Sequence, residues 1–367
     1  MAIIDFDGWA DVLTGYSTEI KPGETVGISG GVAAEELLSA IYRSVLRRGG
    51  LPVLAPVFTD TQADLLLTGT DEQVQFIAPF ERWSREQADV TIDVLASSNT
   101  RSEAAVNPAR QKLWDQSRAE LRRRAFERAA SGERRWSLTI FPTAAYAQDA
   151  DMSTAEFTRF LAAACMLDRP DPVAAWRELS TRQAAMIDYL QQRDEIHVIG
   201  PGTDLRLSVK NRRWVNSDGK RNFPSGEVFT GPVENSVEGE IAFSFPVVTH
   251  GREITDIRLR FSAGKVVDAA AAKNEEFLIT SLDTDPGARQ LGEFAFGTNT
   301  GIDRWTKNIL LDEKMGGTIH MALGAGYPET GSSNQSAIHW DLISDIRHSG
   351  IVTADGEVVL ERGTYRI

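Results

Sequence analysis

Apolar positions in the first half of the chain alternate between two spacings, one typical of helices and one typical of buried strands. Residues 33–48 carry apolar side chains at helical spacing, and Gly49-Gly50 ends that stretch. Short apolar runs lie on either side of it, at residues 25–29 and 51–54. A strand, a helix and a second strand in this order predict a parallel sheet flanked by helices.

Further segments continue this alternation almost to residue 190. We expect buried strands at residues 90–95 and 136–141, and helices at residues 9–16 and 107–130. The N-terminal half is therefore predicted to be an α/β domain with a mainly parallel sheet.

Near residue 193 the pattern changes, and short strands separated by Gly and Asn turns become dominant. Strands are expected at residues 195–200 and 206–209, and a helix at residues 269–282. We therefore predict two domains: residues 1–193 form the α/β domain, and residues 194–367 form a β-rich α+β domain.

Length and charge narrow the classes of function. A chain of 367 residues is too long for one ordinary hydrophobic core, which agrees with two domains. The net charge of −13 argues against nucleic acid or an anionic membrane as a partner. No apolar run approaches the roughly 18 residues that would span a bilayer. The first residues lack a basic region followed by an apolar one, so the expected location is cytoplasmic.

Cysteine usage limits the kinds of metal site that are possible. Cys165 is the only cysteine, which excludes an intrachain disulfide and a thiolate zinc cluster. Any metal would have to be bound by His, Asp and Glu side chains.

Two of the five histidines lie in apolar segments of the C-terminal third. His320 is in the apolar run at residues 318–323, and His339 and Asp341 are spaced i, i+2, which places both on one face of a strand. Buried imidazoles and carboxylates cost free energy unless they are paired or bound to metal. Taken alone, His320 fits a hydrogen-bonded core histidine equally well, and the His-x-Asp pair is a weak pattern.

Three glutamates complete the set of candidates. Glu227 follows a Pro-Ser-Gly turn, Glu293 follows a glycine, and Glu313 follows Asp312. Each alone has the ordinary interpretation of a helix cap or a surface residue. Together with the histidines they provide carboxylate and imidazole ligands that suit Zn, Mn, Co or Fe, and a pair of divalent ions needs such a carboxylate-rich set. His197, His250 and His348 lack comparable neighbours and are expected to be structural or on the surface.

Four blocks occur in the order found in a known family. They resemble the thermophilic metalloaminopeptidases of the aminopeptidase T, AmpS and PepS type. The blocks lie at residues 222–232, 291–293, 311–324 and 334–341, and weaker similarities precede them.

The resemblance implies a two-metal aminopeptidase that removes N-terminal residues from peptides, works as a homodimer and carries its metals in the β-rich domain. It implies two divalent ions (Zn, Co or Mn) held by Glu227, Glu293, Glu313, His320, His339 and Asp341. It also implies a catalytic role for Tyr327, as a hydrogen-bond donor to the developing oxyanion. Glu293 would be either the base that takes a proton from water or a ligand that bridges the metals.

One block departs from the family pattern. Family members carry Asp-Glu-Asn with the metal-binding His five positions after the Glu, whereas here Lys314 follows Glu313 and His320 comes seven positions later. Both possibilities for Glu313, ligand and non-ligand, therefore stay open.

Three other functions were weighed. Ring-cleaving dioxygenases of the dihydroxypyridine type are similar to this family and bind one iron, here through His320, His339 and Asp341. A non-catalytic binding protein would use its acidic residues only as turn caps. Nucleotide binding at residues 27–31 is disfavoured, because the segment lacks the Gly-x-Gly-x-x-Gly spacing and a P-loop lysine.

Overall fold

The computed structural model describes residues 4–249 and 252–367, which divide into two compact units. The first unit extends to Val173 and includes Gly219–Pro224, and the second comprises Ala174–Asp218 and Ser225–Ile367. His250, which was predicted to be structural or on the surface, lies outside the described residues. No helix in the described part of the chain is both long and apolar enough to cross a membrane.

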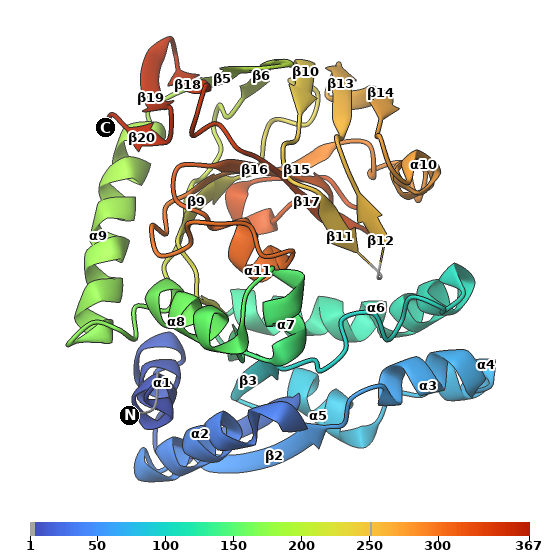
Figure 1. Cartoon of the computed structure of the whole chain (residues 1–367), viewed down its shortest axis with the longest axis vertical. Helices are drawn as coiled ribbons and strands as arrows, with labels where there is room; N and C mark the ends of the chain where they lie inside the picture. Colours follow the sequence, from blue (N-terminus) through green and yellow to red (C-terminus); the bar gives the residue numbers. More distant parts are fainter. Residues whose placement is uncertain (1–3, 250–251) are drawn as a thin grey trace. The chain divides into compact units, whose positions relative to one another are not determined.

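The first unit is built on a parallel sheet with the strand order β2-β1-β3-β4-β8 (Figure 1). Its strands are β1 (Thr25–Gly31), β2 (Leu51–Val57), β3 (Val90–Leu95), β4 (Arg135–Ile140) and β8 (Asn222–Phe223). The strand β8 belongs to the segment Gly219–Pro224, which is part of the first unit although it follows residues of the second unit in the sequence. The four strands predicted from apolar runs are β1 to β4 of this sheet, and β8 was not predicted.

Helices connect the strands of the first unit. They are α1 (Phe6–Val12), a π-helical turn (Leu13–Ser17), a 3₁₀ turn (Val32–Ala34), α2 (Glu35–Arg47), α3 (Thr61–Thr68), α4 (Asp71–Gln75), α5 (Pro79–Glu86), α6 (Pro108–Ala130), α7 (Ala144–Asp149) and α8 (Thr154–Ala164). Two glycines of β1 show which helices cover the sheet: a Cβ on Gly27 would meet Trp83 of α5, and a Cβ on Gly30 would meet Leu38 of α2. Because the two positions face opposite sides of the strand, α5 and α2 cover opposite faces.

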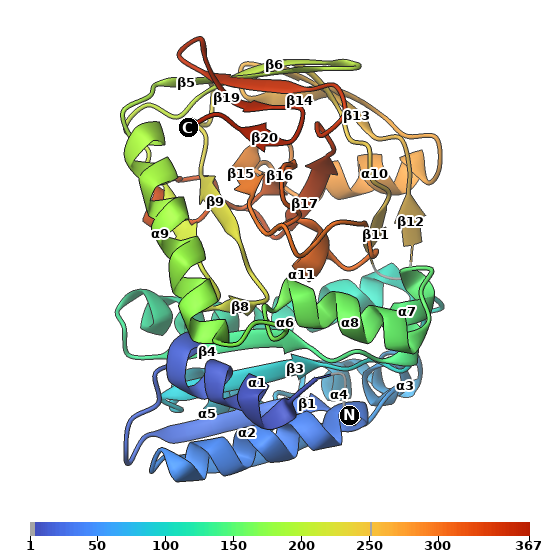
Figure 2. The same cartoon turned by 60° about the vertical axis from the view of Figure 1, so that its left-hand side comes forward.

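The second unit contains most of the helix α9 (Pro172–Leu190) and two larger antiparallel sheets (Figure 2). The eight-stranded sheet has the order β14-β13-β10-β6-β5-β18-β19-β20. Its strands are β5 (Glu195–Gly200), β6 (Thr203–Ser208), β10 (Glu238–Ala242), β13 (Arg258–Ser262), β14 (Lys265–Ala270), β18 (Ile351–Ala354), β19 (Glu357–Glu361) and β20 (Thr364–Tyr365). Burial alternates along β6 and β13, as expected for a sheet with one face in solvent.

The five-stranded sheet has the order β17-β16-β15-β9-β7. Its strands are β7 (Val215–Ser217), β9 (Glu227–Thr230), β15 (Leu291–Gly297), β16 (Ile319–Gly324) and β17 (His339–Ser344). The remaining elements are the β-ribbon of β11 (Val247–Thr249) and β12 (Arg252–Ile254), the helices α10 (Glu275–Leu282) and α11 (Ile309–Asp312), and a 3₁₀ turn (Pro328–Thr330). Every residue of β9, β15 and β16 is buried, so both faces of this sheet are covered.

One hydrophobic core joins the two larger sheets of the second unit. Val198 and Leu205 from the eight-stranded sheet belong to the same cluster as Phe294 and Met321 from the five-stranded sheet. One face of the five-stranded sheet therefore packs into this core, and its opposite face is available for polar groups. A parallel α/β unit and an antiparallel β-rich unit confirm the predicted fold class.

The helix predicted at residues 269–282 is wrong in its first part. Ala269 and Ala270 are the end of β14 and pair with Leu259 and Arg258 of β13. The helix α10 begins only after Asn274. The alanine run at residues 269–272 has a high helix propensity, but strand pairing and packing of Ala269 against the core override it.

The change between the units also differs from the predicted boundary near residue 193. The second unit begins at Ala174, so it contains most of α9. Met186 and Leu190 of α9 are members of the core of the second unit, and Ile187 packs against it. Helical periodicity made α9 resemble the preceding helices, but its apolar face belongs to the β-rich unit.

Candidate metal centre

Five of the six predicted ligands lie on one face of the five-stranded sheet. Residues directly opposite each other in an antiparallel pair project to the same face. Each of the five stands opposite a small residue: Glu227 opposite Gly297, Glu293 opposite Ala322, His320 opposite Ala295, His339 opposite Gly324, and Asp341 opposite Ala322. The small residues leave room for the longer carboxylate and imidazole groups to converge above the sheet.

A β-bulge turns Glu293 towards this face. The register with β16 shifts between Leu291 and Glu293. Leu291 and Phe294 are both in the hydrophobic core, although three positions separate them along the strand. Without the extra residue, Glu293 would project to the same side as Leu291 and into the core. Gly292 permits the bulge, because a Cβ there would collide with the carbonyl oxygen of Ala325.

A tight turn positions Glu227 at the start of β9. Gly226 has a φ of +118°, a conformation open to glycine, and a Cβ there would lie 2.7 Å from the Cβ of Asn299. The side chain of Asn299 donates a 2.8 Å hydrogen bond to the carbonyl oxygen of Ser225. The turn formed by the Pro-Ser-Gly-Glu sequence therefore fixes the backbone position from which the Glu227 side chain projects.

Glu313 enters the cluster from outside the sheet, at the end of α11. Asn308 caps the start of this helix by accepting a 3.2 Å hydrogen bond from the amide of Leu310. Asp312 accepts hydrogen bonds of 2.8 Å and 2.6 Å from the amide and hydroxyl of Thr306. The side chain of Glu313 is only 12% exposed, so the surface interpretation of this residue does not hold.

The side chains form three overlapping groups whose candidate ligand atoms lie within 4.8 Å of one another. The groups are Glu227, Glu293 and His320; Glu293, His339 and Asp341; and Glu313, His320 and Asp341. Glu293 contributes to two groups, with one carboxylate oxygen 3.7 Å from Nε2 of His320 and the other 3.2 Å from Nε2 of His339. This places Glu293 between the two imidazoles.

The orientation of His339 suits a ligand. Its Nδ1 lies 2.8 Å from the carbonyl oxygen of Ala325, and a carbonyl can only accept a hydrogen bond. The proton of the neutral ring is therefore on Nδ1, and the lone pair of Nε2 faces Glu293 and Asp341. Hydrogen bonding of one ring nitrogen to a backbone carbonyl is the usual way in which a metal-binding histidine is oriented.

In the cluster, burial and the neighbouring charges shift the pKa values of the ionisable side chains in opposite directions. Burial raises the pKa of Glu313 above its usual range. Burial also acts to raise the pKa of Glu293, but its interactions with His320 and His339 outweigh that effect and lower it. The same carboxylates raise the pKa of both histidines, although burial alone would lower it. Carboxylates so close together require cations, in the form of protonated side chains or metal ions.

Tyr327 lies at the edge of the cluster. Its ring centroid is 5.0 Å from the imidazole of His339 and 5.4 Å from the ring of Phe229 on β9. Burial, followed by the charge of Glu293, raises the pKa of the phenol well above its usual value. The hydroxyl therefore keeps its proton at neutral pH and is a hydrogen-bond donor.

Two buried atoms test whether a divalent metal would fit. Oε2 of Glu227 and Nδ1 of His320 are buried and form no hydrogen bond within the described residues, and Oε2 lies at a longer distance, 3.4 Å, from Nε2 of His320. Unpartnered buried polar atoms are costly, and coordination is one way to satisfy them. Imidazole nitrogens and carboxylate oxygens are also ligands that Zn, Mn and Co accept. The residues therefore fit the metal that the sequence predicted.

The sequence analysis missed Lys314 as part of the cluster. Its side chain is fully buried, and Nζ lies 3.5 Å from Oε1 of Glu227 and also contacts Oε1 of Glu313. The available signal was its position between Glu313 and the apolar residue Met315. The other described histidines belong to none of the three groups: His197 pairs with Asp204 at 2.7 Å, and His348 is exposed.

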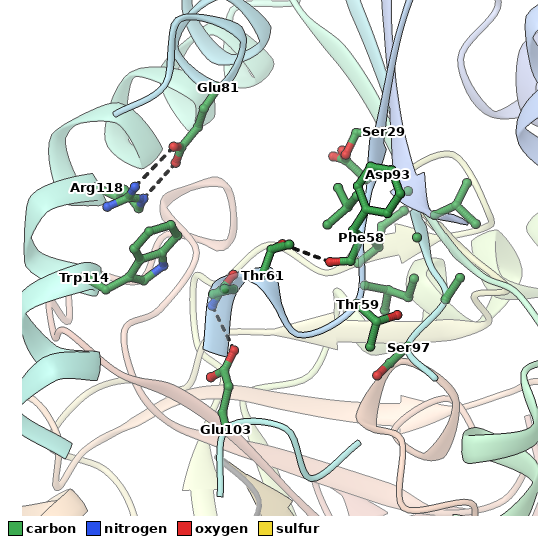
Figure 3. A pocket seen from close by; sticks show the side chains of 18 of the residues that line it. Ser29, Phe58, Thr59, Thr61, Glu81, Asp93, Ser97, Glu103, Trp114 and Arg118 are labelled. Carbon is green, nitrogen blue, oxygen red and sulfur yellow. Dashed lines mark hydrogen bonds and ion pairs between the residues drawn. The ribbon is translucent and has the colours of Figure 1, made fainter. Parts of the chain in front are cut away.

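The first unit contains a separate cavity of about 810 Å³ (Figure 3). Phe58 and Trp114 line it, and Nε of Arg118 lies 3.0 Å from Oε1 of Glu81. None of the six predicted ligands is among the lining residues. Arg118 also donates hydrogen bonds to the carbonyl oxygens of Val74 and Phe76, so its charge already serves the packing of this unit.

Comparisons with known proteins identify relatives of this chain and proteins that share its fold. Aminopeptidase 2 of Geobacillus stearothermophilus is 29% identical to this chain over 96% of the chain and 95% of the relative. The solved structure of wild-type AmpT from Thermus thermophilus superposes with a TM-score of 0.85 at 23% identity, covering 99% of each chain. A 2,5-dihydroxypyridine dioxygenase from Pseudomonas putida also shares the fold, at a TM-score of 0.61 and 15% identity over 100% of this chain and 98% of its own.

The family profile identifies the chain more directly than the shared fold does. The profile described as thermophilic metalloprotease (M29) matches residues 5–365, which is nearly the whole sequence. This confirms the family resemblance and the prediction that the protein is an enzyme. The chain belongs to the thermophilic metalloprotease family M29 and is a metal-dependent hydrolase of peptide bonds.

Proposed function

We propose that this metalloprotease is a two-metal aminopeptidase that removes N-terminal residues from peptides. The observation that carries the proposal is the convergence of Glu227, Glu293, His320, His339 and Asp341 on one face of the five-stranded sheet, where the first three are buried and Asp341 is partly buried. Glu313 reaches the same cluster from α11. Two relatives of this chain, from Geobacillus stearothermophilus and Streptococcus thermophilus, are named as aminopeptidases.

The six residues would hold divalent Zn, Co or Mn. Bound there, such ions would act as Lewis acids towards a water molecule and the scissile carbonyl group. The carboxylates of Glu227, Glu313 and Asp341 would also attract the ammonium group of a peptide N-terminus, which an N-acetylated peptide lacks. The acidity of the cluster is thus a reason to expect an exopeptidase.

Glu293 has two possible roles in this proposal. Its carboxylate can accept the proton of the attacking water, or it can bridge two ions, since its two oxygens face different histidines. A Glu293→Gln variant separates these roles because it keeps an oxygen ligand and removes the base. Full metal content with little turnover supports the base, and loss of metal supports the bridging ligand.

Tyr327 would donate a hydrogen bond to the oxyanion that develops on the scissile carbonyl. Its protonated hydroxyl and its position beside His339 support this role. A donor of this kind contributes through a charge that exists only in the transition state.

The decisive experiment uses apoenzyme to which zinc, cobalt, manganese or ferrous iron is returned separately. Hydrolysis of aminoacyl anilides and of free peptides, with no hydrolysis of N-acetylated peptides, is the expected result. Bound metal should approach two ions per chain. Failure on all peptide substrates despite full metal loading would refute the proposal, and cleavage of a dihydroxypyridine ring with one bound iron would establish the dioxygenase alternative.

The homodimer and the cytoplasmic location stay predictions. Sedimentation equilibrium tests the first, and cell fractionation tests the second. Neither is required for the chemistry proposed for the cluster.

A further inference from the structure

Lys314 is a buried cation inside a candidate metal centre. Its side chain has no exposed surface, so bulk water does not solvate the ammonium group. Its partners are the carboxylates of Glu227 and Glu313, both of which are themselves buried. The carboxylates compensate the cost of burying the lysine, and the lysine compensates part of their repulsion.

Lys314 forms ion pairs with carboxylates of two of the three groups of candidate ligands. Glu227 belongs to the group with Glu293 and His320, and Glu313 belongs to the group with His320 and Asp341. Each of these groups thus shares one carboxylate with the ammonium. Within the described residues, no ion pair joins Lys314 to Glu293, His339 or Asp341, although the charge of Asp341 also acts on the ammonium group at longer range.

We propose that Lys314 makes the metal positions unequal. The first divalent ion binds to Glu293, His339 and Asp341, whose oxygens form no ion pair with the ammonium group. A second ion needs Glu227 or Glu313 and binds only in competition with Lys314, so its affinity is much lower. This inference rests on the proposed metalloaminopeptidase function and adds that Lys314 controls whether the centre holds one ion or two.

The charge balance supports the same order. Glu227, Glu293, Glu313 and Asp341 together carry four negative charges when they are ionised. One divalent ion and Lys314 supply three positive charges, and a second divalent ion brings the total to five. Electrostatic repulsion between the second ion and a fixed ammonium group a few ångströms away opposes full loading.

The first test uses the full-length wild-type protein. Metal-free enzyme is titrated with zinc by calorimetry, and zinc content is measured after equilibrium dialysis. We expect one tight step and one step that is at least about a hundredfold weaker. Two steps of equal affinity would overturn the proposal.

The second test compares three lysine variants. Lys314→Met removes the charge and should tighten the second step about tenfold or more, while the first step changes less than about threefold. Lys314→Arg keeps the charge and should keep the weak second step. Lys273→Met is the matched control: this exposed lysine of the same unit pairs with Glu253 at 3.0 Å, and its loss should change neither step.

The outcomes separate this inference from the proposed function. An unchanged second step in folded Lys314→Met would refute the role of Lys314 and leave the aminopeptidase intact. Absence of zinc binding in the wild-type protein would refute the metal centre itself. If Lys314→Met does not fold, the wild-type titration and Lys314→Arg still decide, because a tight second step in either contradicts the proposal.

Discussion

The two large sheets of the second unit have the same alternating pattern but use their polar residues differently. Along β6 of the eight-stranded sheet, Asp204 and Arg206 point to solvent between the buried residues Leu205 and Leu207. Along β16 of the five-stranded sheet, His320 alternates with core residues in the same way, yet it is 1% exposed. Alternation therefore shows which side chains share a face, and it does not show whether that face is wet.

The difference lies in the residues around the polar ones. On the eight-stranded sheet, the exposed Arg206 stands opposite the exposed Glu238 and the partly buried His197. On the five-stranded sheet, His320 stands opposite Ala295 on β15 and Ile343 on β17, and Asp341 stands opposite Ala322. A buried polar residue with a small residue opposite it on a neighbouring strand therefore indicates a binding or catalytic site better than either feature does alone.

The largest expected effect comes from removing a histidine from each sheet. His320→Ala should lower kcat/KM for aminoacyl anilides on the order of a thousandfold or more and reduce the bound metal, because two of the ligand groups lose their imidazole. His197→Ala should stay within about twofold of wild type, since His197 belongs to none of the three groups of candidate ligands. Steady-state kinetics and elemental analysis of metal content measure both. Equal losses in the two variants would remove the distinction between the sheets.

The next largest effect is expected from Tyr327, at the edge of the cluster of candidate metal ligands. Tyr327→Phe should lower kcat about a hundredfold to a thousandfold with metal content unchanged, because one hydrogen-bond donor to the transition state is lost. KM should change little, since the hydrogen bond forms mainly in the transition state. A variant with normal kcat would show that the phenol only packs against Phe229 and His339.

Much of this arrangement could be predicted from the sequence. The i, i+2 spacing of His339 and Asp341 placed both on one strand face, and the apolar run around His320 predicted its burial. The bulge at Glu293 could not be predicted, since it depends on pairing with β16 and on the approach of Ala325 to Gly292. Lys314 was missed because a lysine beside a glutamate is usually a surface pair, and only the folded structure shows that its side chain is fully buried.

An intermediate effect should follow from filling the space opposite the ligands. Ala322 is fully buried between Glu293 and Asp341. Ala322→Leu should lower zinc affinity about tenfold to a hundredfold by displacing those carboxylates, and overpacking should cost about 1–3 kcal/mol of unfolding free energy. Val267→Leu on β14 of the eight-stranded sheet is the control, because its side chain is 49% exposed. Zinc titration and denaturant unfolding measure both terms, and unchanged zinc affinity in Ala322→Leu would show that small residues there have no role in the centre.

The smallest effect concerns a carboxylate of the second unit that is satisfied without metal. Asp345 follows β17, and its side chain lies 2.8 Å from Arg347. Burial acts to raise the pKa of Asp345, but the hydrogen bonds and charge of Arg347 outweigh it and lower the pKa below 3.8. A carboxyl whose pKa is lower in the folded state stabilises the protein above its unfolded pKa and loses that contribution as the pH falls through the folded value.

In metal-free protein, Asp345→Asn should therefore cost about 1 kcal/mol or less at pH 7, because the pair is partly screened by water. The difference in unfolding free energy from wild type should shrink as the pH falls below 4, as measured by urea unfolding across the pH range. A difference that grows with acidity would mean that Asp345, like the carboxylates of the cluster, depends on a partner other than Arg347.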